Sequence, residues 1–255
     1  MEKIAIATLI KGVGENYNKW QETLVLIRNQ SVLRNFEGSF DLILFHEGNL
    51  HPNYINKIKY SKKEWSNIKF VEVPNFKLSA DELESLKSQI LDIGNVRTGY
   101  SSMCRFWAYG FLDYLNEYDY VIRIDDDCIA LNGINPIIEE LKSNRYITFP
   151  TLGNEEFRFG LKDYLKMYFD KPNIEEEDID VPYTNFCGFN LKKIRRDKRI
   201  RNFFKEIENN HFIHRYSWND TLLWGIVMKY FLKDEQWLEM KEIKYIHLSH
   251  LSYIN

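Results

Sequence analysis

The stretch "YVIRIDDDCIAL", residues 120–131, is an apolar run that ends in three consecutive aspartates. Its valine and isoleucine residues favour a buried strand, whereas unpaired carboxylates are costly to bury. Alternate residues of an extended strand point to the same side, so Asp125 and Asp127 can face one ligand together. Two carboxylates held in this way suit a hard divalent cation, Mn²⁺ or Mg²⁺. The stretch therefore predicts a metal–diphosphate site, and the alternative is a solvated turn in which Asp127 caps the segment that follows.

Segments typical of strands and helices alternate around this stretch. The strand-like segments are 3–10, 40–48 and 68–74, and the segments with helical spacing are 16–27, 81–94 and 99–119. This order favours an α/β fold with a mainly parallel sheet. In such sheets ligands bind beyond the carboxyl ends of the strands, which is where the aspartates lie.

Length and composition narrow the class of protein. The chain has 255 residues, which fits one large α/β domain, and the acidic stretch 173–182 is interpreted as a loop within it. A net charge of −3 argues against a general nucleic-acid binder. Three widely spaced cysteines suit a reducing compartment. The N-terminus lacks a signal-peptide layout, and no apolar run is long enough to span a membrane, so we expect a soluble cytoplasmic protein.

Two blocks of the sequence carry motifs of a known family. The first block, 100–131, matches a helix motif and a strand-end motif through Tyr100, Met103, Cys104, Arg105, Phe106, Tyr120, Arg123 and Asp127. The second block, 215–250, matches through Trp218, Asp220 and His247. Both blocks resemble the fungal-type α-1,2-mannosyltransferases. The resemblance implies one GT-A-like (Rossmann-like) domain with a mixed, mainly parallel central sheet.

The resemblance also implies a function for the whole of residues 1–255. It implies a metal-dependent glycosyltransferase that moves a sugar, with mannose favoured, from a nucleoside-diphosphate sugar to a glycan or other hydroxyl acceptor. Residues 1–130 would bind the nucleotide sugar and residues 131–255 the acceptor. GDP-mannose is the favoured donor, a UDP-sugar remains open, and the expected cofactor is Mn²⁺ or Mg²⁺.

Six residues are candidates for the donor and metal sites. Asp125, Asp127 and His247 would hold the metal, and Tyr100, Arg105, Arg123 and Asp125 would bind the donor. Neutral imidazole is a good Mn²⁺ ligand, and the alternative for His247 is a surface histidine. Arg105 falls off the apolar stripe of its helix and could reach a phosphate or simply lie at the surface. Arg123 interrupts an apolar strand, so it should pair with an acidic residue or the donor phosphate.

Three further residues are candidates for catalysis and acceptor binding. The family has a glutamate in the segment equivalent to 183–194, where this chain is aligned with Asn190. An amide is a far weaker nucleophile than a carboxylate, so Asn190 would position groups in a front-face retaining route. Asp220 would bind acceptor hydroxyls or, in an inverting route, act as base, and the alternative is a capping box with Ser217. Trp218 could stack on a sugar or belong to the core.

Two other classes of function stay open besides an inverting transferase. A sugar-nucleotide nucleotidyltransferase would normally have a glycine-rich loop after its first strand, where this chain offers only Gly12 and Gly14. A degenerate, non-catalytic sugar- or nucleotide-binding module is the other alternative, and Asn190 in place of the family's glutamate keeps it open. The product distinguishes these classes: a glycosyltransferase releases nucleoside diphosphate, a nucleotidyltransferase releases pyrophosphate, and a binding module releases neither.

Overall fold

The computed structural model describes residues 2–10, 19–48, 50–60, 67–74, 76–86, 98–174 and 178–249. Its strands are β1 (Ile4–Leu9), β2 (Asp41–His46), β3 (Asn67–Glu72), β4 (Tyr120–Ile124), β5 (Cys128–Ala130), β6 (Ile147–Phe149), β7 (Leu152–Glu155), β8 (Ile179–Pro182), β9 (Phe186–Asn190), β10 (Trp237–Glu239) and β11 (Tyr245–His247). Seven of them form one sheet in the order β10-β6-β9-β4-β1-β2-β3. In this sheet β9 is antiparallel to both neighbours, and the other pairs are parallel. The predicted α/β fold with a mixed, mainly parallel sheet is confirmed.

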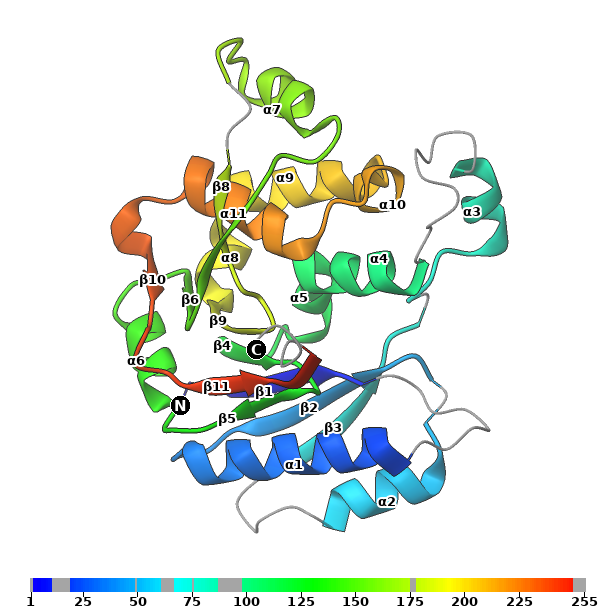
Figure 1. Ribbon diagram of the computed structural model, residues 1–255, viewed down its shortest axis with the longest axis vertical. Coiled ribbons are helices and arrows are strands. Elements are labelled where there is room, and N and C mark those ends of the chain that lie inside the picture. Colours follow the sequence, from blue (N-terminus) through cyan, green and yellow to red (C-terminus); the bar gives the residue numbers. More distant parts are fainter. Residues whose placement is uncertain are drawn as a thin grey trace.

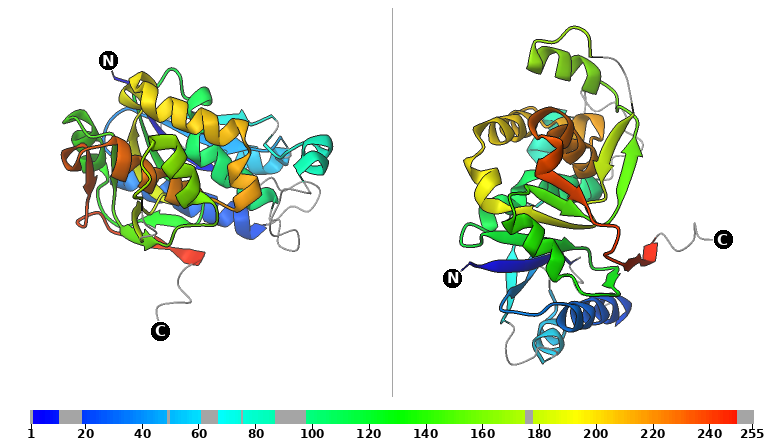
Figure 2. Two further views of the ribbon diagram at one scale, coloured as in Figure 1. Left: turned by 90° about the horizontal axis from the view of Figure 1, so that it is seen from above. Right: turned by 90° about the vertical axis from the view of Figure 1, so that its left-hand side faces the viewer.

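Helices cover both faces of the central sheet (Figures 1 and 2). The α-helices are α1 (Lys19–Asn35), α2 (Pro52–Tyr60), α3 (Ala80–Leu86), α4 (Thr98–Arg105), α5 (Phe111–Tyr114), α6 (Asn135–Lys142), α7 (Leu161–Phe169), α8 (Leu191–Arg196), α9 (Lys198–Asn209), α10 (Phe212–Tyr216) and α11 (Asp220–Phe231). A π-helix, η3 (Phe106–Gly110), joins α4 to α5, and a 3₁₀-helix, η4 (Asp234–Gln236), precedes β10. Among the described residues no helix has both the length and the apolar character needed to cross a membrane.

The alternation of side chains along β4 divides the core in two. Ile122 and Ile124 face the cluster that α1 and α6 cover, and Val121 faces the larger cluster under α5 and α11. Arg123 lies on the same side of the strand as Val121 and is 2% exposed. The strand thus places one charge inside the larger core, one residue before the chain leaves the sheet.

The helix predicted over 99–119 is a composite of α4, η3 and α5. It ends at Tyr114, and the π-helical turn contains Trp107. A π-helical turn inserts one extra residue per turn and leaves carbonyl groups displaced, which is common at functional sites. Here the Trp107 carbonyl accepts a hydrogen bond from the indole of Trp224 on α11 at 3.2 Å. The turn therefore ties α11 to the helix that precedes β4.

The region after β6 departs from the sequence prediction. Residues 179–182, predicted to lie in a loop, form β8, which pairs with β7 in a two-stranded antiparallel sheet. Helix α7, between these strands, projects beyond the body of the molecule (Figure 1). Gly225 of α11 allows close packing on β8, because an added Cβ would lie 2.6 Å from the Val181 side chain and 2.8 Å from the Asp180 carbonyl oxygen. The prediction of a loop was wrong because the acidic residues mask a short strand whose alternate side chains are buried.

Candidate active site

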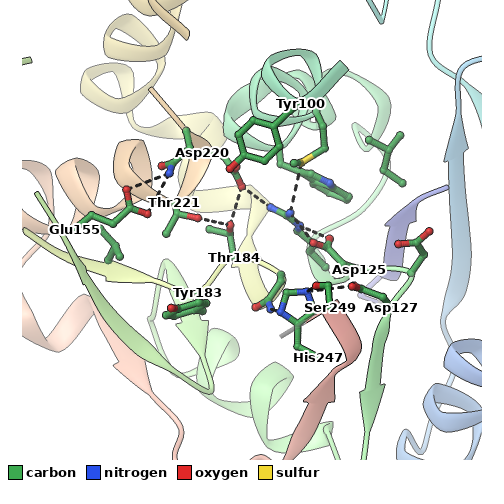
Figure 3. A pocket seen from close by; sticks show the side chains of 18 of the residues that line it. Tyr100, Asp125, Asp127, Glu155, Tyr183, Thr184, Asp220, Thr221, His247 and Ser249 are labelled. Carbon is green, nitrogen blue, oxygen red and sulfur yellow. Dashed lines mark hydrogen bonds and ion pairs between the residues drawn. The ribbon is translucent and has the colours of Figure 1, made fainter. Parts of the chain in front are cut away.

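A cavity of about 500 Å³ opens at the carboxyl ends of β1 and β4. Leu9 ends β1 on one side of it, and Asp125, Asp126 and Asp127 follow β4 directly. Figure 3 shows two ends of this cavity: His247 and Asp127 lie at one end, and Glu155 lies at the other. The triple aspartate is thus the wall of a pocket, as the position of the motif at a strand end predicted.

The buried guanidinium of Arg123 offsets part of the negative charge at the end of β4. Its guanidinium donates to both oxygens of Asp125, at 2.8 and 3.0 Å, and to Asp220 Oδ2 at 2.5 Å. The ring of Trp107 lies 4.5 Å from the guanidinium carbon and covers its face. Against burial, the two carboxylates raise the pKa of Arg123 above its ordinary value, so it stays charged. The expected pairing of Arg123 with an acidic residue is confirmed.

Asp127 and His247 form a second polar pair in the cavity. Their side chains approach to 3.3 Å between Oδ1 and Nε2, and the Ser249 hydroxyl lies 2.9 Å from the same Nε2. Burial acts to raise the pKa of Asp127, but hydrogen bonds from His247 and Ser249 outweigh it and hold the pKa below its usual value. β11 brings these residues together, since it pairs with β5 in a register that sets His247 opposite Cys128.

This group fits a divalent cation. Asp127, Cys128 and His247 offer ligand atoms that lie within 4.8 Å of one another. Burial raises the pKa of the Cys128 thiol, so the carboxylate and imidazole are the effective ligands, a set that suits Mn²⁺ better than a soft metal. Asp125 is not one of these three residues, and the guanidinium of Arg123 donates to both of its oxygens. The predicted metal roles of Asp127 and His247 fit this geometry, and the metal role of Asp125 stays a prediction.

Asn185 fixes the orientation of the His247 ring. Its side-chain amide lies 2.7 Å from Nδ1, and the Tyr245 hydroxyl donates to its oxygen at 3.3 Å. With the amide nitrogen facing Nδ1, the ring proton sits on Nε2 and points at Asp127. Metal binding through Nε2 needs the opposite tautomer, which an Asn185 turned to present its oxygen would stabilise. The Tyr245 hydroxyl can donate or accept, so it suits both orientations.

Asp126 also lines the cavity, and its charge interacts with that of Arg28 on α1. Burial raises its pKa to about 7, the charges of Asp125 and Asp127 add to this effect, and the buried guanidinium of Arg28 opposes it. Arg28 itself donates to the Ile124 carbonyl at 3.1 Å. The three aspartates therefore have three different surroundings, and only Asp127 contributes to the candidate metal group.

At its other end, the cavity is lined by neutral polar groups around one glutamate. The Asn219 amide donates to both oxygens of Glu155, at 3.1 and 3.0 Å. The hydroxyl groups of Thr184 and Thr221 lie 3.0 Å apart, and Thr184 also donates to Asp220 Oδ2 at 2.7 Å. The ring of Tyr183 borders the same space (Figure 3). Hydroxyl, amide and aromatic groups together are typical of sites that bind sugars.

Asp220 lines the cavity, and Trp218 does not. The cap of α11 is Asn219, whose side chain accepts from the Leu222 N–H at 2.7 Å, so the alternative considered for Asp220, a capping box with Ser217, is wrong. This leaves Asp220 free to turn toward Arg123 and the cavity. Trp218 is 1% exposed, and its indole donates to the Phe159 carbonyl at 3.0 Å. The acceptor-stacking role predicted for Trp218 is therefore replaced by a core role.

Asn190 lies at the wrong end of its strand for the role predicted. β9 runs antiparallel to β4, so Asn190 pairs with Tyr120 at the start of β4, far from the aspartates. Its side chain caps α8, accepting from the Lys193 N–H at 3.1 Å, and donates to the Leu141 carbonyl at 3.0 Å. The front-face role assigned to Asn190 is incompatible with this position. The residue that pairs with Arg123 across the strands is Cys187.

The two remaining donor-binding candidates differ in their positions. Tyr100 borders the cavity and is 49% exposed. Arg105 lies outside the cavity lining, where its guanidinium donates to the Phe76 carbonyl at 3.4 Å. The structure thus brings Tyr100, Arg123, Asp125, Asp127, Asp220 and His247 to one cavity and leaves Arg105, Asn190 and Trp218 outside it.

Sequence reasoning missed several polar and aromatic residues of the cavity. Among them are Glu155, Tyr183, Thr184, Asn185 and Asn219. A signal existed in "YTN", residues 183–185, which stands directly before the apolar run of β9. Because β9 is antiparallel, its amino end, and not its carboxyl end, lies beside the aspartates.

Comparison with known proteins supports the fold assignment. No protein-family model matches the sequence, and no curated protein sequence matches it. Among solved structures, the mannosyltransferase Ktr4p from S. cerevisiae superimposes with a TM-score of 0.81 at 14% identity, over 96% of this chain and 70% of that one. A Ktr4p structure in complex with GDP gives a TM-score of 0.76 at 13% identity, over 96% of this chain and 71% of that one.

Two further structures extend the comparison. The core-mannan synthase A (CmsA/Ktr4) from Aspergillus fumigatus, in an Mn/GDP form, gives a TM-score of 0.71 at 14% identity, over 97% of this chain and 75% of that one. Mouse xyloside xylosyltransferase 1 gives 0.55 at 11% identity, over 93% of this chain and 85% of that one. The chain therefore has the GT-A fold of these glycosyltransferases.

Proposed function

We propose that this protein is a metal-dependent glycosyltransferase that uses a nucleoside-diphosphate sugar as donor. The observation that carries the proposal is the cavity at the carboxyl end of β4. At one end it holds a carboxylate–imidazole pair, Asp127 and His247, and at the other end it is lined by polar and aromatic groups of the kind that bind sugars. Two facts support the proposal: the chain has the GT-A fold of the solved transferases that it resembles, and the cavity lies at the carboxyl ends of parallel strands, where open α/β sheets generally bind ligands.

The donor would bind at the end of the cavity that holds Asp127 and His247. Five carboxylates and one guanidinium line the cavity, so a diphosphate needs a cation to offset their repulsion. A bound Mn²⁺ or Mg²⁺ would stabilise the charge that develops on the leaving diphosphate. Asp127 and His247 would hold that ion, Asn185 would orient the imidazole, and Asp125, fixed by Arg123, would accept a donor hydroxyl group such as those of the ribose.

The two halves proposed for the chain both contribute to this cavity. Residues 1–130 supply Asp125, Asp127 and Tyr100, and residues 131–255 supply Glu155 and Asp220. We still assign the first half to donor binding and the second half to acceptor binding, with one residue as an exception. His247 comes from the second half but would serve the donor side, because the pairing of β11 with β5 carries it there.

We further propose that transfer retains the anomeric configuration. The bond between the sugar C1 and the diphosphate oxygen breaks, the bond between C1 and the acceptor oxygen forms, and the acceptor proton moves to the leaving phosphate oxygen. An inverting route would need a side chain as base. Asp220 Oδ2 already accepts hydrogen bonds from Arg123 and Thr184, and Glu155 already accepts hydrogen bonds from Asn219. Both carboxylates are therefore better suited to accept hydrogen bonds from a bound hydroxyl group than to remove its proton as a base.

GDP-mannose is the donor that we propose first, and a UDP-sugar is the alternative. The support is that Ktr4p and the Aspergillus synthase are mannosyl-transferring or mannan-synthesising proteins solved with GDP. The test is a screen of GDP and UDP with and without Mn²⁺ by thermal shift, followed by turnover of the matching nucleotide sugars. We expect a nucleotide-dependent rise in melting temperature that needs the metal, and release of nucleoside diphosphate. Release of pyrophosphate would identify a nucleotidyltransferase, and binding without turnover a non-catalytic module.

A matched pair of variants assigns the activity to the site. Asp127→Ala should remove metal-dependent nucleotide binding while the fold survives. Asp113→Ala changes an exposed acidic residue outside the cavity lining, and it should alter neither the nucleotide binding nor the fold. Calorimetry with Mn²⁺ and the nucleotide measures both. An Asp127→Ala protein with unchanged metal-dependent affinity would overturn the metal assignment. NMR of the product distinguishes an α-linkage, which we expect from an α-linked donor, from the β-linkage of an inverting enzyme.

A further inference from the structure

Helix α8 and the start of helix α9 carry a concentration of positive charge. Residues 192–205 hold eight basic side chains and one acidic side chain, which gives this segment a net charge of +7. The whole chain has a net charge of −3, so the remaining residues carry −10. Charge is therefore separated within the molecule, with one basic segment in an otherwise acidic protein.

The cations of α9 lie on its outer face. The inner face consists of four buried apolar residues, Ile200, Phe203, Phe204 and Ile207. Lys198, Arg201 and Lys205 are exposed, and their spacing of three and four residues sets them in one row along the helix. Arg196, the last residue of α8, is also exposed and borders the same hollow as Lys198. We call Arg196, Lys198, Arg201 and Lys205 the α9 basic face.

Neighbouring carboxylates leave the charge of the α9 basic face uncompensated. In the part of the chain that the structure describes, no carboxylate forms an ion pair with any of its four cations. Asp197, the acidic residue of the segment, pairs with Arg199 instead and caps α9. The four charges are thus available to a partner.

The two glutamates of α9 lie at the flanks of the helix. Burial, and then the charge of Glu206, raises the pKa of Tyr164 on α7. Burial, and then the charge of Glu208, raises the pKa of Tyr109 in η3. Both carboxylates therefore lie near neighbouring elements, and the helical period of 3.6 residues puts the row of cations between them.

The order of charges along α9 opposes the dipole of the helix. The first turn contains no acidic residue, and the last turn contains no basic residue. Lys198 and Arg201 instead lie near the amino end, where the helix dipole is positive, and Glu208 lies near the carboxyl end, where it is negative. Stability of the helix does not account for this order, whereas attraction of a negatively charged partner does.

The α9 basic face lies on the opposite side of the molecule from the candidate active site. Both views of Figure 2 show α9 (yellow) and β11 (red), which carries His247, on opposite sides. The chain order agrees, because α8 follows the end of β9 that pairs with the start of β4, and the cavity is at the other end of β4. A partner bound at α9 would leave the cavity open.

The shape of the α9 basic face favours a surface as the partner. At 1.5 Å per residue, the row from Lys198 to Lys205 extends over about 10 Å of the outer side of a helix. Charges spread in this way suit a partner whose own negative charge is spread over an area. The row begins beside a hollow of about 490 Å³, lined by Tyr146, Lys193, Arg196, Asp197 and Lys198. A hollow of this size can take a small phosphorylated group.

We infer that the α9 basic face docks the protein on a membrane whose surface contains anionic phospholipids, with the candidate active site facing away from the bilayer. The acidic remainder of the chain is repelled by the same surface, so the charge separation also sets the orientation. Each Lys or Arg near such a surface strengthens binding by roughly fivefold, so four cations give a reversible attachment that salt weakens. The inference goes beyond the proposed function and does not depend on catalysis.

The experiment measures sedimentation of the protein with vesicles of phosphatidylcholine that contain either no phosphatidylserine or about 30% of it. The test variant combines Lys198→Gln, Arg201→Gln and Lys205→Gln. The control combines Lys59→Gln, Lys171→Gln and Lys241→Gln, which remove the same charge at exposed positions on three other parts of the chain.

The wild-type protein should bind the vesicles that contain phosphatidylserine, and the binding should be lost between about 0.1 M and about 0.5 M NaCl. The test variant should bind roughly 100-fold more weakly, and the control should bind nearly as well as wild type. The melting temperature of the test variant should not fall, because the lost cations oppose the helix dipole. Its metal-dependent nucleotide binding should be unchanged, since the cavity is on the other side of the molecule.

Three results would overturn the inference. The first is equal binding of the wild-type protein to vesicles with and without phosphatidylserine, which needs no variant and therefore holds even if the test variant does not fold. The second is equal loss of vesicle binding in the test variant and the control. The third is tighter binding of the wild-type protein to a short DNA duplex than to the vesicles at the same salt, which would identify a nucleic-acid partner.

Discussion

Replacing Arg123 by leucine tests whether the guanidinium holds the site together. The side chains of Arg123 and Asp220 are 3% and 5% exposed, and that of Asp125 is 24% exposed. Removing the guanidinium leaves the Asp220 carboxylate buried without its cationic partner, although the Thr184 hydroxyl still donates to it at 2.7 Å. Breaking a buried ion pair from one side costs about 3–5 kcal/mol, because the remaining charge is left unpaired. At about 2–4 °C per kcal/mol for a chain of this size, the melting temperature should fall by roughly 6–20 °C.

A double-mutant cycle with Asp220→Asn isolates the pair. Because the second change removes the charge that Arg123→Leu leaves unpaired, the double variant should lose less stability than the sum of the single changes, by at least about 1 kcal/mol. Urea unfolding measures all four proteins. Arg199→Leu is the surface control: the Arg199 side chain is 61% exposed in its pair with Asp197, and its loss should cost less than about 1 kcal/mol. Additive losses in the cycle, or an Arg123→Leu cost no greater than that of Arg199→Leu, would refute the reasoning.

Three other predictions follow from single contacts. Burial, and then nearby positive charges, lower the pKa of His214 to about 4 from 6.5, so the folded state resists protonation and stability should fall as the pH drops from 6.5 to 4. His214→Leu should remove about 2 kcal/mol of the stability difference between pH 7.5 and pH 5 in urea unfolding, and an unchanged difference would contradict the assignment. Asn185→Leu should weaken Mn²⁺ binding by roughly 10- to 100-fold in calorimetry, because the ring of His247 loses its orienting partner; equal affinity would exclude that role. Gly225→Ala should destabilise the fold by about 1–3 kcal/mol through overpacking against β8, whereas Gly110→Ala, with nothing nearer than 3.6 Å, should not, and equal effects on unfolding would show that the close approach does not matter.

The sequence by itself determined the elements that depend on local pattern. β1, β2, β3 and β4 lie within a few residues of the segments predicted, because runs of apolar, β-branched residues encode strands without reference to the rest of the chain. The same reasoning required a partner for Arg123, since a charge inside an apolar strand cannot stay unpaired. It also placed Asp127 at the edge of the sheet where the carboxyl ends of the parallel strands meet, which is the edge at which such sheets generally bind ligands.

Only the tertiary structure decided which of these residues meet. His247 reaches Asp127 through the register of β11 against β5, and nothing in the local pattern of either strand specifies that register. The antiparallel direction of β9 moved Asn190 away from the cavity and brought Asn185 into it, although both belong to the same short segment. Strand direction and register are set by the summed packing of both sheet faces, and a one-residue shift would exchange those faces. The physical information that assembles the site is therefore distributed over contacts between distant segments, whereas the information that builds each strand is local.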